Sequence, residues 1–266
     1  MEGAGVHLHR VFGFSEAPDL DPFLLLDDFR SDRREDYISG FPWHPHRGIE
    51  TITYVLKGDV AHGDSLGNEG VISAGDVQWM TAGSGIIHQE MPRGDSQGAM
   101  YGFQLWANLP AKQKMMDPRY RGITADEIPE VILDNGVAVK VIAGTVAGAA
   151  GPVTDIVIDP QYLDCRLPPD TDYDHQTEFD YTTFIYVIDG EALIDGTVSG
   201  NGTLVLFEEG DQVHIGTKRG TRFLLLSGQP LKEPVAWQGP IVMNTQAELD
   251  IAFREYRENT FIKHKK

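Results

Sequence analysis

Cysteine is almost absent from this chain of 266 residues, in which Cys165 stands alone. A single cysteine cannot form an intrachain disulfide, and this usage is typical of a protein kept in a reducing compartment. Long apolar stretches are absent as well: no run of about 18 apolar residues occurs, and the opening MEGAGVHLHRVFGF lacks an apolar signal region. We therefore expect a soluble, cytoplasmic protein that has no contact with a membrane.

Positive charge is scarce. The chain has 22 lysine and arginine residues against 40 aspartate and glutamate residues, which gives a formal net charge of -18. Such a surface repels nucleic acids and anionic membranes unless a basic patch is present. The short RSDRR at residues 30–34 and the final KHKK are too small to serve as one. The composition thus favours a small-molecule ligand or a protein partner over direct nucleic-acid binding.

Glycine and proline are plentiful, with 29 and 15 residues spread along the chain. Between them lie short segments rich in β-branched and aromatic residues, a pattern typical of β-sandwiches and barrels. Helix is expected only in a turn within 110–120 and after Thr245, where Glu248 completes a capping box. The fold class is therefore all-β, with strands at 23–29, 49–56, 70–82, 99–109, 137–146, 162–167, 182–195, 202–207, 212–217 and 221–228.

An internal repeat runs through the chain. The segment ITYVLKGDVAHGD (52–64) resembles FIYVIDGEALIDG (184–196), and GVISAGD (70–76) resembles TLVLFEEGD (203–211), in the same order. Repeats of strands and glycine turns indicate duplicated β units. Small residues at 147–153 suit a linker. We expect two similar barrels, at residues 1–146 and 147–266.

Two pairs of metal-binding side chains lie in the first repeat. His44 and His46 occur in FPWHPHRGIE, and His88 and Glu90 occur in GSGIIHQEMP. Residues two apart on a strand share a face, so each pair is placed to hold one ion. Three imidazoles and a carboxylate suit Fe(II), Mn, Ni, Co, Cu or Zn. A lone H-x-H is a weak signal, but two such pairs in one β unit favour a metal site.

The carboxylate is ambiguous from the residues alone. Glu50 follows His46 by four positions and is expected on the same face, where it competes with Glu90 for the metal or orients the imidazoles. His62 and Asp64 form a third pair with the same spacing, and we interpret it as polar surface or as support around the site.

The second repeat serves as an internal control. Aligning ITYV with FIYV places Gln176 and Glu178 at the positions of His44 and His46. Aligning the two Gly-Asp turns places Phe223 and Leu225 at the positions of His88 and Glu90, so the second unit lacks this set. If folding required these residues, the second unit would need them too. Their presence in the first unit alone therefore indicates chemistry or binding there.

The segments DPFLLLDDF, GFPWHPHRGIETITYVLKGDVAHGD, GSGIIHQE, GFQLWANLPAKQKMMDPRY and FIYVIDGEALIDG resemble those of pirins, a bicupin family, over nearly the whole chain. The resemblance implies two tandem cupin barrels of the jelly-roll type, with one metal ion, usually iron, in the first. It also implies that the ligands are His44, His46, His88 and Glu90, and so selects Glu90 over Glu50.

For the function, the resemblance implies two alternatives. Bacterial pirins resemble quercetin 2,3-dioxygenases, which suggests an Fe(II)-dependent enzyme that opens a flavonol-like aromatic substrate with O2 and releases CO. Because both barrels lie in one chain, we expect a monomer. Glu90, at the metal, is then the catalytic base. Eukaryotic pirins are described as iron-dependent transcriptional cofactors, which suggests a redox-sensitive binding protein that regulates an enzyme or a transcription factor.

Overall fold

The computed structural model describes residues 3–156 and 158–264. These form two compact units, which we describe separately. The first contains the residues up to Ala125 together with those from Leu231 onward, and the second runs from Asp126 to Pro230. The units thus divide the chain at other positions than the expected junction at 147–153, because residues 138–143 pair with 162–166 of the second unit and the last segment of the chain packs on the first barrel.

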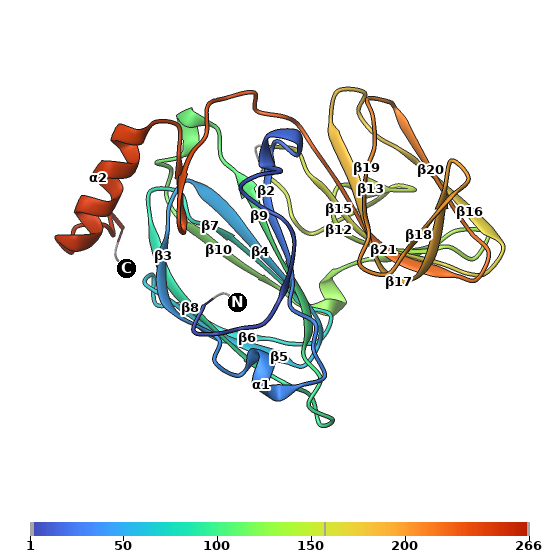
Figure 1. Ribbon diagram of the computed structural model, residues 1–266, viewed down its shortest axis with the longest axis horizontal. Coiled ribbons are helices and arrows are strands. Elements are labelled where there is room, and N and C mark those ends of the chain that lie inside the picture. The colour runs from blue at the N-terminus through green and yellow to red at the C-terminus, as the bar shows by residue number, and fades with distance from the viewer. Residues whose placement is uncertain (1–2, 157, 265–266) are drawn as a thin grey trace. The chain divides into compact units, whose positions relative to one another are not determined.

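The first unit consists of two facing sheets (Figure 1). One has the order β1 (His9–Phe12), β2 (Phe23–Asp28), β9 (Tyr101–Asn108), β4 (Ile49–Lys57), β7 (Val77–Thr81) and β10 (Arg119–Ile123). The other has the order β3 (Phe41–His46), β8 (Ile86–Arg93), β5 (Asp59–Asp64) and β6 (Glu69–Ile72). Side chains of the two sheets meet between them, as where Gln78 of β7 contacts His62 of β5. The space between the sheets is therefore the interior of a barrel.

Short helices and a returning C-terminal segment complete the first unit. The helices are η1 (Ala17–Asp19), α1 (Arg34–Tyr37), η2 (Ala111–Gln113) and, at its boundary, η3 (Ala125–Glu127). The returning segment contains β22 (Ala236–Gln238), β23 (Ile241–Met243) and α2 (Gln246–Arg257), which lies near β3 in Figure 1.

The second unit is a β-barrel with an apolar core. Its main sheet has the order β11 (Glu130–Ile132), β12 (Ala138–Ala143), β15 (Gln161–Leu167), β21 (Thr221–Gly228), β17 (Thr182–Ile194), β20 (Gln212–Thr217) and β16 (Thr171–Gln176). Strands β18 (Thr197–Gly200) and β19 (Leu204–Leu206) pair with β17, and β13 (Thr145–Val146) pairs with β14 (Ala149–Ala150). The interior is filled by buried side chains such as Ile185, Val187 and Phe223.

The all-β class, the scarcity of helix and the C-terminal helix are confirmed. Thr245 is the N-cap of α2 and forms the predicted capping box with Glu248. The segment 70–82, expected as one strand, is two, because the chain turns at Gly75, whose φ is +94°. Within residues 3–156 and 158–264, no helix is both long enough and apolar enough to cross a membrane.

Candidate metal centre

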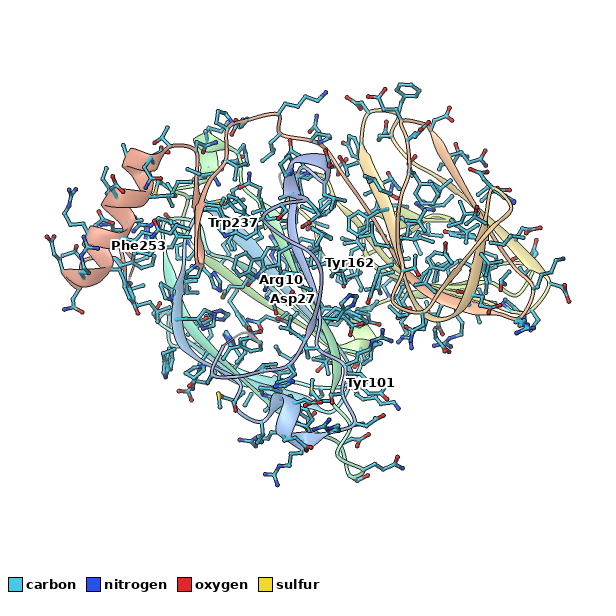
Figure 2. The ribbon with its side chains drawn as sticks, viewed as in Figure 1. Arg10, Asp27, Tyr101, Tyr162, Trp237 and Phe253 are labelled. Atoms are coloured by element: carbon cyan, nitrogen blue, oxygen red, sulfur yellow. The ribbon has the colours of Figure 1, made fainter. Side chains whose placement is uncertain are left out.

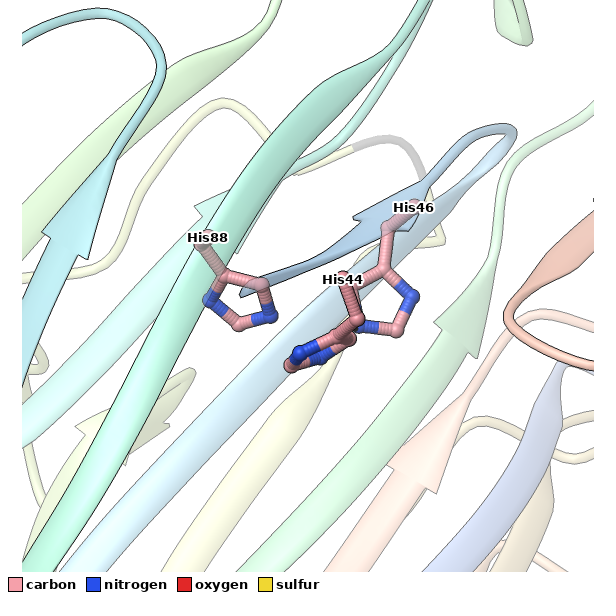
Figure 3. A group of neighbouring side chains, drawn as sticks. All are labelled: His44, His46 and His88. Carbon is pink, nitrogen blue, oxygen red and sulfur yellow. Dashed lines mark hydrogen bonds between the residues drawn. The ribbon is translucent and has the colours of Figure 1, made fainter. Parts of the chain in front are cut away.

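The three predicted histidines converge between two neighbouring strands. His44 and His46 lie on β3 and His88 lies on β8, where His88 is the direct ladder partner of His44. Alternation along β3 points both of its imidazoles to the barrel interior, toward the ring of His88 (Figure 3). One nitrogen from each ring can be chosen so that all three lie within 4.8 Å of one another. The two sequence pairs therefore meet as a single cluster.

Backbone carbonyls fix the orientation of two of these rings. Nδ1 of His44 lies 2.8 Å from the carbonyl oxygen of Pro42, and Nδ1 of His46 lies 2.9 Å from that of Pro240. A carbonyl only accepts, so each Nδ1 carries a proton and each neutral ring presents the lone pair of Nε2. The two Nε2 atoms lie 3.0 Å apart. Two lone pairs at this distance repel each other unless a cation lies between them.

His88 is the most deeply buried of the three, with no exposed surface. Neither of its ring nitrogens has a hydrogen-bond partner among the described residues. Burial, reinforced by the other histidines, holds the pKa of His88 and that of His46 well below the usual range. The rings are thus neutral near pH 7, which is the form that binds metals.

These observations fit a bound transition-metal ion. Ligand nitrogens about 2.1 Å from a metal and at right angles to each other lie about 3 Å apart, close to the separation of the two Nε2 atoms. One of the two unpaired nitrogens of His88 gains a partner when an ion binds. Imidazole suits zinc, copper, iron and nickel alike, so the donor set indicates the class of metal rather than one element.

Glu90 lies on β8 two residues beyond His88, and its side chain is buried. Its Oε1 accepts a hydrogen bond of 2.7 Å from Thr53 of β4, on the facing sheet. Among the described residues, the cluster within 4.8 Å contains the three histidines and not Glu90. Glu90 lines the same cavity as His44 and His46, and its role as a ligand remains a prediction.

Glu50 lies in a different environment from the one expected. Its carboxylate accepts hydrogen bonds from Trp79 Nε1 at 3.1 Å and Thr81 Oγ1 at 2.5 Å, and burial raises its pKa. The expectation that it shares a face with His46 is wrong, because the chain turns at Gly48 and β4 belongs to the other sheet. Carbonyl groups, rather than Glu50, orient the imidazoles of β3.

The pair His62 and Asp64 is buried rather than on the surface. The ring of His62 lies 5.7 Å from that of His88 and stacks on Tyr120 at 4.8 Å, while Nδ1 of His62 lies 3.1 Å from Gln78. The pair therefore belongs to the packing around the cluster. Sequence spacing could not reveal Tyr120 or Gln78, because both come from strands of the opposite sheet.

A cavity of about 700 Å³ opens beside the histidines, within the range of sites for small organic molecules. Its walls are largely apolar and aromatic. A bidentate pair between Arg10 and Asp27, with both N–O distances at 2.9 Å, adds a polar spot that is visible with Trp237 in Figure 2. The lining residues with aromatic rings, apart from the histidines, are Phe14, Phe29, Phe41, Trp106 and Trp237.

Strand pairing corrects the correspondence between the two repeats. The ladder partner of His44 is His88, and the matching ladder of the second unit pairs His175 with Val213. His175, rather than Gln176, is thus the counterpart of His44. Val213 and Ile215, rather than Phe223 and Leu225, replace His88 and Glu90, because the Gly-Asp turn at 75–76 precedes β7, whereas the one at 210–211 precedes β20.

The residues at these positions of the second unit have other partners. Both ring nitrogens of His175 are engaged, one with the hydroxyl of Tyr173 at 2.9 Å and the other with Gln161 at 2.5 Å. Val213 and Ile215 are apolar and buried in the core. One histidine with two protein partners does not form a metal site.

Comparison with known proteins agrees with this architecture. A family model described as Pirin matches residues 5–107, and one described as Pirin C-terminal cupin domain matches residues 162–262. A pirin-like protein of Caulobacter vibrioides is 45% identical over 98% of this chain and 94% of its own length. This chain belongs to the pirin family. The resemblance found in the sequence is thereby confirmed.

Other pirin relatives carry an enzyme name. A protein of Thermoplasma acidophilum, provisionally named quercetin 2,3-dioxygenase, is 42% identical over 89% of this chain and 98% of its own. The crystal structure of quercetin 2,3-dioxygenase from Acinetobacter baumannii superimposes with a TM-score of 0.87 and 34% identity, and the match covers 98% of this chain and 93% of that chain. The expected pair of cupin-type barrels is confirmed by this likeness and by the C-terminal cupin match.

Proposed function

We propose that this pirin is a metal-dependent dioxygenase of the quercetin 2,3-dioxygenase type, with iron(II) held by His44, His46, His88 and Glu90. The observation that carries the proposal is the convergence of three imidazoles, two with Nε2 atoms that face each other and one with unpaired nitrogens, beside a largely apolar cavity. The name of the Acinetobacter baumannii protein, which is similar over nearly the whole chain, supports the choice of reaction.

A metal ion held by these residues would act as a Lewis acid that lowers the pKa of a substrate hydroxyl. In the proposed reaction, O2 adds across the C2–C3 bond of a flavonol. The ring opens, both oxygen atoms remain in the products, and one ring carbon leaves as CO.

Glu90 is the residue that we propose takes the proton of the flavonol 3-hydroxyl. Its carboxylate lines the cavity and lies on the same strand as His88. The hydrogen bond from Thr53 to Oε1 keeps the carboxylate in place beside the histidines.

The cavity walls hold the substrate and limit the access of water. Trp106 packs edge-on against the ring of His46 at 5.0 Å and 83°, and Trp237 lies 5.9 Å from Trp106. Flat apolar rings fit between such surfaces, and the pair Arg10–Asp27 offers hydrogen bonds to hydroxyl groups on the substrate.

The test is turnover by the loaded protein. Purified protein is loaded with Fe(II) without air, quercetin and air are added, and loss of the flavonol absorbance is followed together with CO release. We expect metal-dependent loss that disappears in His88→Ala. One bound metal per chain without turnover, for iron, nickel, copper or manganese, would overturn the dioxygenase and favour the redox-sensitive binding protein.

A further inference from the structure

The last segment of the chain pairs with the residue that follows the strand carrying two histidines. We call residues 231–264 the C-terminal arm. Strand β3 is the end strand of its sheet, and the arm forms a parallel bridge with it between Arg47 and Ile241. The amide of Val242 also donates to the carbonyl of Arg47 at 3.1 Å. The arm therefore pairs with the chain directly after the end of β3.

The turn after β3 is shaped to receive this arm. Gly48 has a φ of +79°, and a Cβ added there would lie 2.0 Å from the carbonyl oxygen of Val242. The buried ammonium of Lys114 donates to the carbonyls of Gly48 at 2.8 Å and of Val242 at 3.0 Å, and to Asn108 at 2.6 Å. Lys114 thus ties the turn to the arm.

Arg47 makes a second connection, farther along the arm. Its side chain is 1% exposed and donates to Ser84 O at 2.7 Å, Glu255 at 2.8 Å and Phe261 O at 3.0 Å. Its guanidinium also lies 4.3 Å from the centre of the Phe261 ring. Two of these three hydrogen bonds end on the arm, so Arg47 would lose most of its partners if the arm moved away.

The arm also contacts the metal centre, through one atom. The carbonyl of Pro240 accepts from Nδ1 of His46 at 2.9 Å, whereas Nδ1 of His44 uses Pro42 on its own strand. Among the described residues, His88 has no partner at either nitrogen. The orientation and tautomer of His46 therefore depend on a segment far away in the sequence.

We propose that the C-terminal arm is a positioning element of the metal centre. The carbonyl of Pro240 holds His46 with Nε2 toward the ion, and Arg47, Gly48 and Lys114 are positioning residues because they hold the arm against β3. This inference rests on the metal site proposed above. It assigns a role to Arg47 and Gly48, the last two residues of H-P-H-R-G, neither of which is a predicted ligand.

A direct consequence follows from thermodynamic linkage. If the arm in place raises the affinity for metal, then metal must by the same factor stabilise the arm in place. Partners that orient a metal-bound imidazole typically change affinity by about 10–100-fold. Metal binding should therefore slow hydrogen exchange in the arm by about 10-fold or more, although the arm supplies no ligand.

The experiment compares hydrogen exchange of the full-length protein with and without Ni(II), a divalent ion that is stable in air. We expect slower exchange in β3, in β8 and in peptides covering 237–262. The internal control is β6, the opposite edge strand of the same sheet. Slowing in β3 and β8 without slowing in the arm would overturn the positioning role and leave the metal site standing. No slowing anywhere, with no Ni(II) bound, would remove the metal site and this inference with it.

A matched pair of variants gives a second, independent readout. Lys114→Met removes the tie between the turn and the arm, while Lys112→Met changes an exposed lysine two residues away. We expect Ni(II) affinity to fall by about 10-fold or more in the first and to stay unchanged in the second. Equal affinities in the two folded variants would contradict the inference. If Lys114→Met does not fold, Glu255→Gln with Glu258→Gln as its control tests the contact with Arg47, with a smaller expected loss.

Discussion

The hydroxyl of Thr53 lies 2.7 Å from Oε1 of Glu90 and reaches that carboxylate from the facing sheet of the first barrel. A second buried carboxylate, Glu50, accepts from Trp79 and Thr81 instead. The two glutamates, which sequence spacing alone left as alternatives, therefore have separate partners, and each can be changed without removing the partners of the other.

Glu90→Gln should separate metal binding from proton transfer. The amide keeps the shape of the side chain and can still accept from Thr53, but it neither takes a proton nor carries a charge. We expect Ni(II) to bind more weakly and flavonol turnover with Fe(II) to fall by at least about 100-fold. Glu50→Gln is the control and should leave both unchanged. A loss of metal that is larger in Glu50→Gln would contradict the assignment.

His88→Leu should abolish metal binding without destabilising the metal-free protein. Leucine removes two buried nitrogens that have no hydrogen-bond partner among the described residues, and replacing such groups by apolar atoms is close to neutral or stabilising. Ni(II) at 100 times its Kd should stabilise the wild type by about 2.7 kcal/mol. Thermal unfolding with and without Ni(II) measures both effects, and an unchanged response to Ni(II) in the variant would refute the role of His88.

Gly48→Ala should destabilise the first unit more than the same substitution at another glycine that has a similar backbone φ. Gly67 has a φ of +83°, close to that of Gly48, but an added Cβ there meets nothing within 4 Å. Gly67→Ala should cost about 1–2 kcal/mol in the free energy of unfolding. Gly48→Ala should cost about 1–3 kcal/mol more, because the arm has to move. Urea unfolding followed by tryptophan fluorescence compares the two variants. Equal losses in the free energy of unfolding would show that the arm moves without an energetic cost.

His175 should make the second unit sensitive to acid. Burial lowers its pKa from 6.5 to about 4, so between these values the unfolded chain binds a proton that the folded chain does not. This contribution to the free energy of unfolding is therefore fully present above about pH 6.5, and about 3 kcal/mol of it is lost as the pH decreases to 4. Unfolding of His175→Gln, followed by circular dichroism over this range, should lack that part of the slope.

His214, in the same unit, should change stability with pH in the opposite direction to His175. Its hydrogen bond to Asp174 raises its pKa, so the folded chain binds the proton more tightly and the stabilisation is lost as the pH rises through the folded pKa. His214→Gln should therefore leave the acid-side loss of the wild type in place. A variant of His214 that abolished this loss would show that His175 is not its source.

Much of the first barrel could be predicted because its signals are local. Alternation along one strand places His44 and His46 together, and the capping box of Thr245 lies within four residues. Contacts across the barrel or from the end of the chain have no local sequence pattern that predicts them. Pro240, Lys114 and Thr53 reach the site only through the pairing of sheets and the return of the arm. The alignment of the repeats likewise failed, because the two Gly-Asp turns precede strands that are not counterparts, and only the ladder that pairs His175 with Val213 shows the register.

The return of the arm also sets an order of events during synthesis. The ribosome makes every histidine of the cluster early, then the whole second barrel, and only afterwards the carbonyl of Pro240 and the partners of Arg47 in α2 and at Phe261. A nascent chain that exposes the first barrel alone lacks these partners of His46 and Arg47. Under the proposed role of the arm, high-affinity metal uptake is confined to the finished polypeptide, and a prematurely terminated chain captures metal poorly.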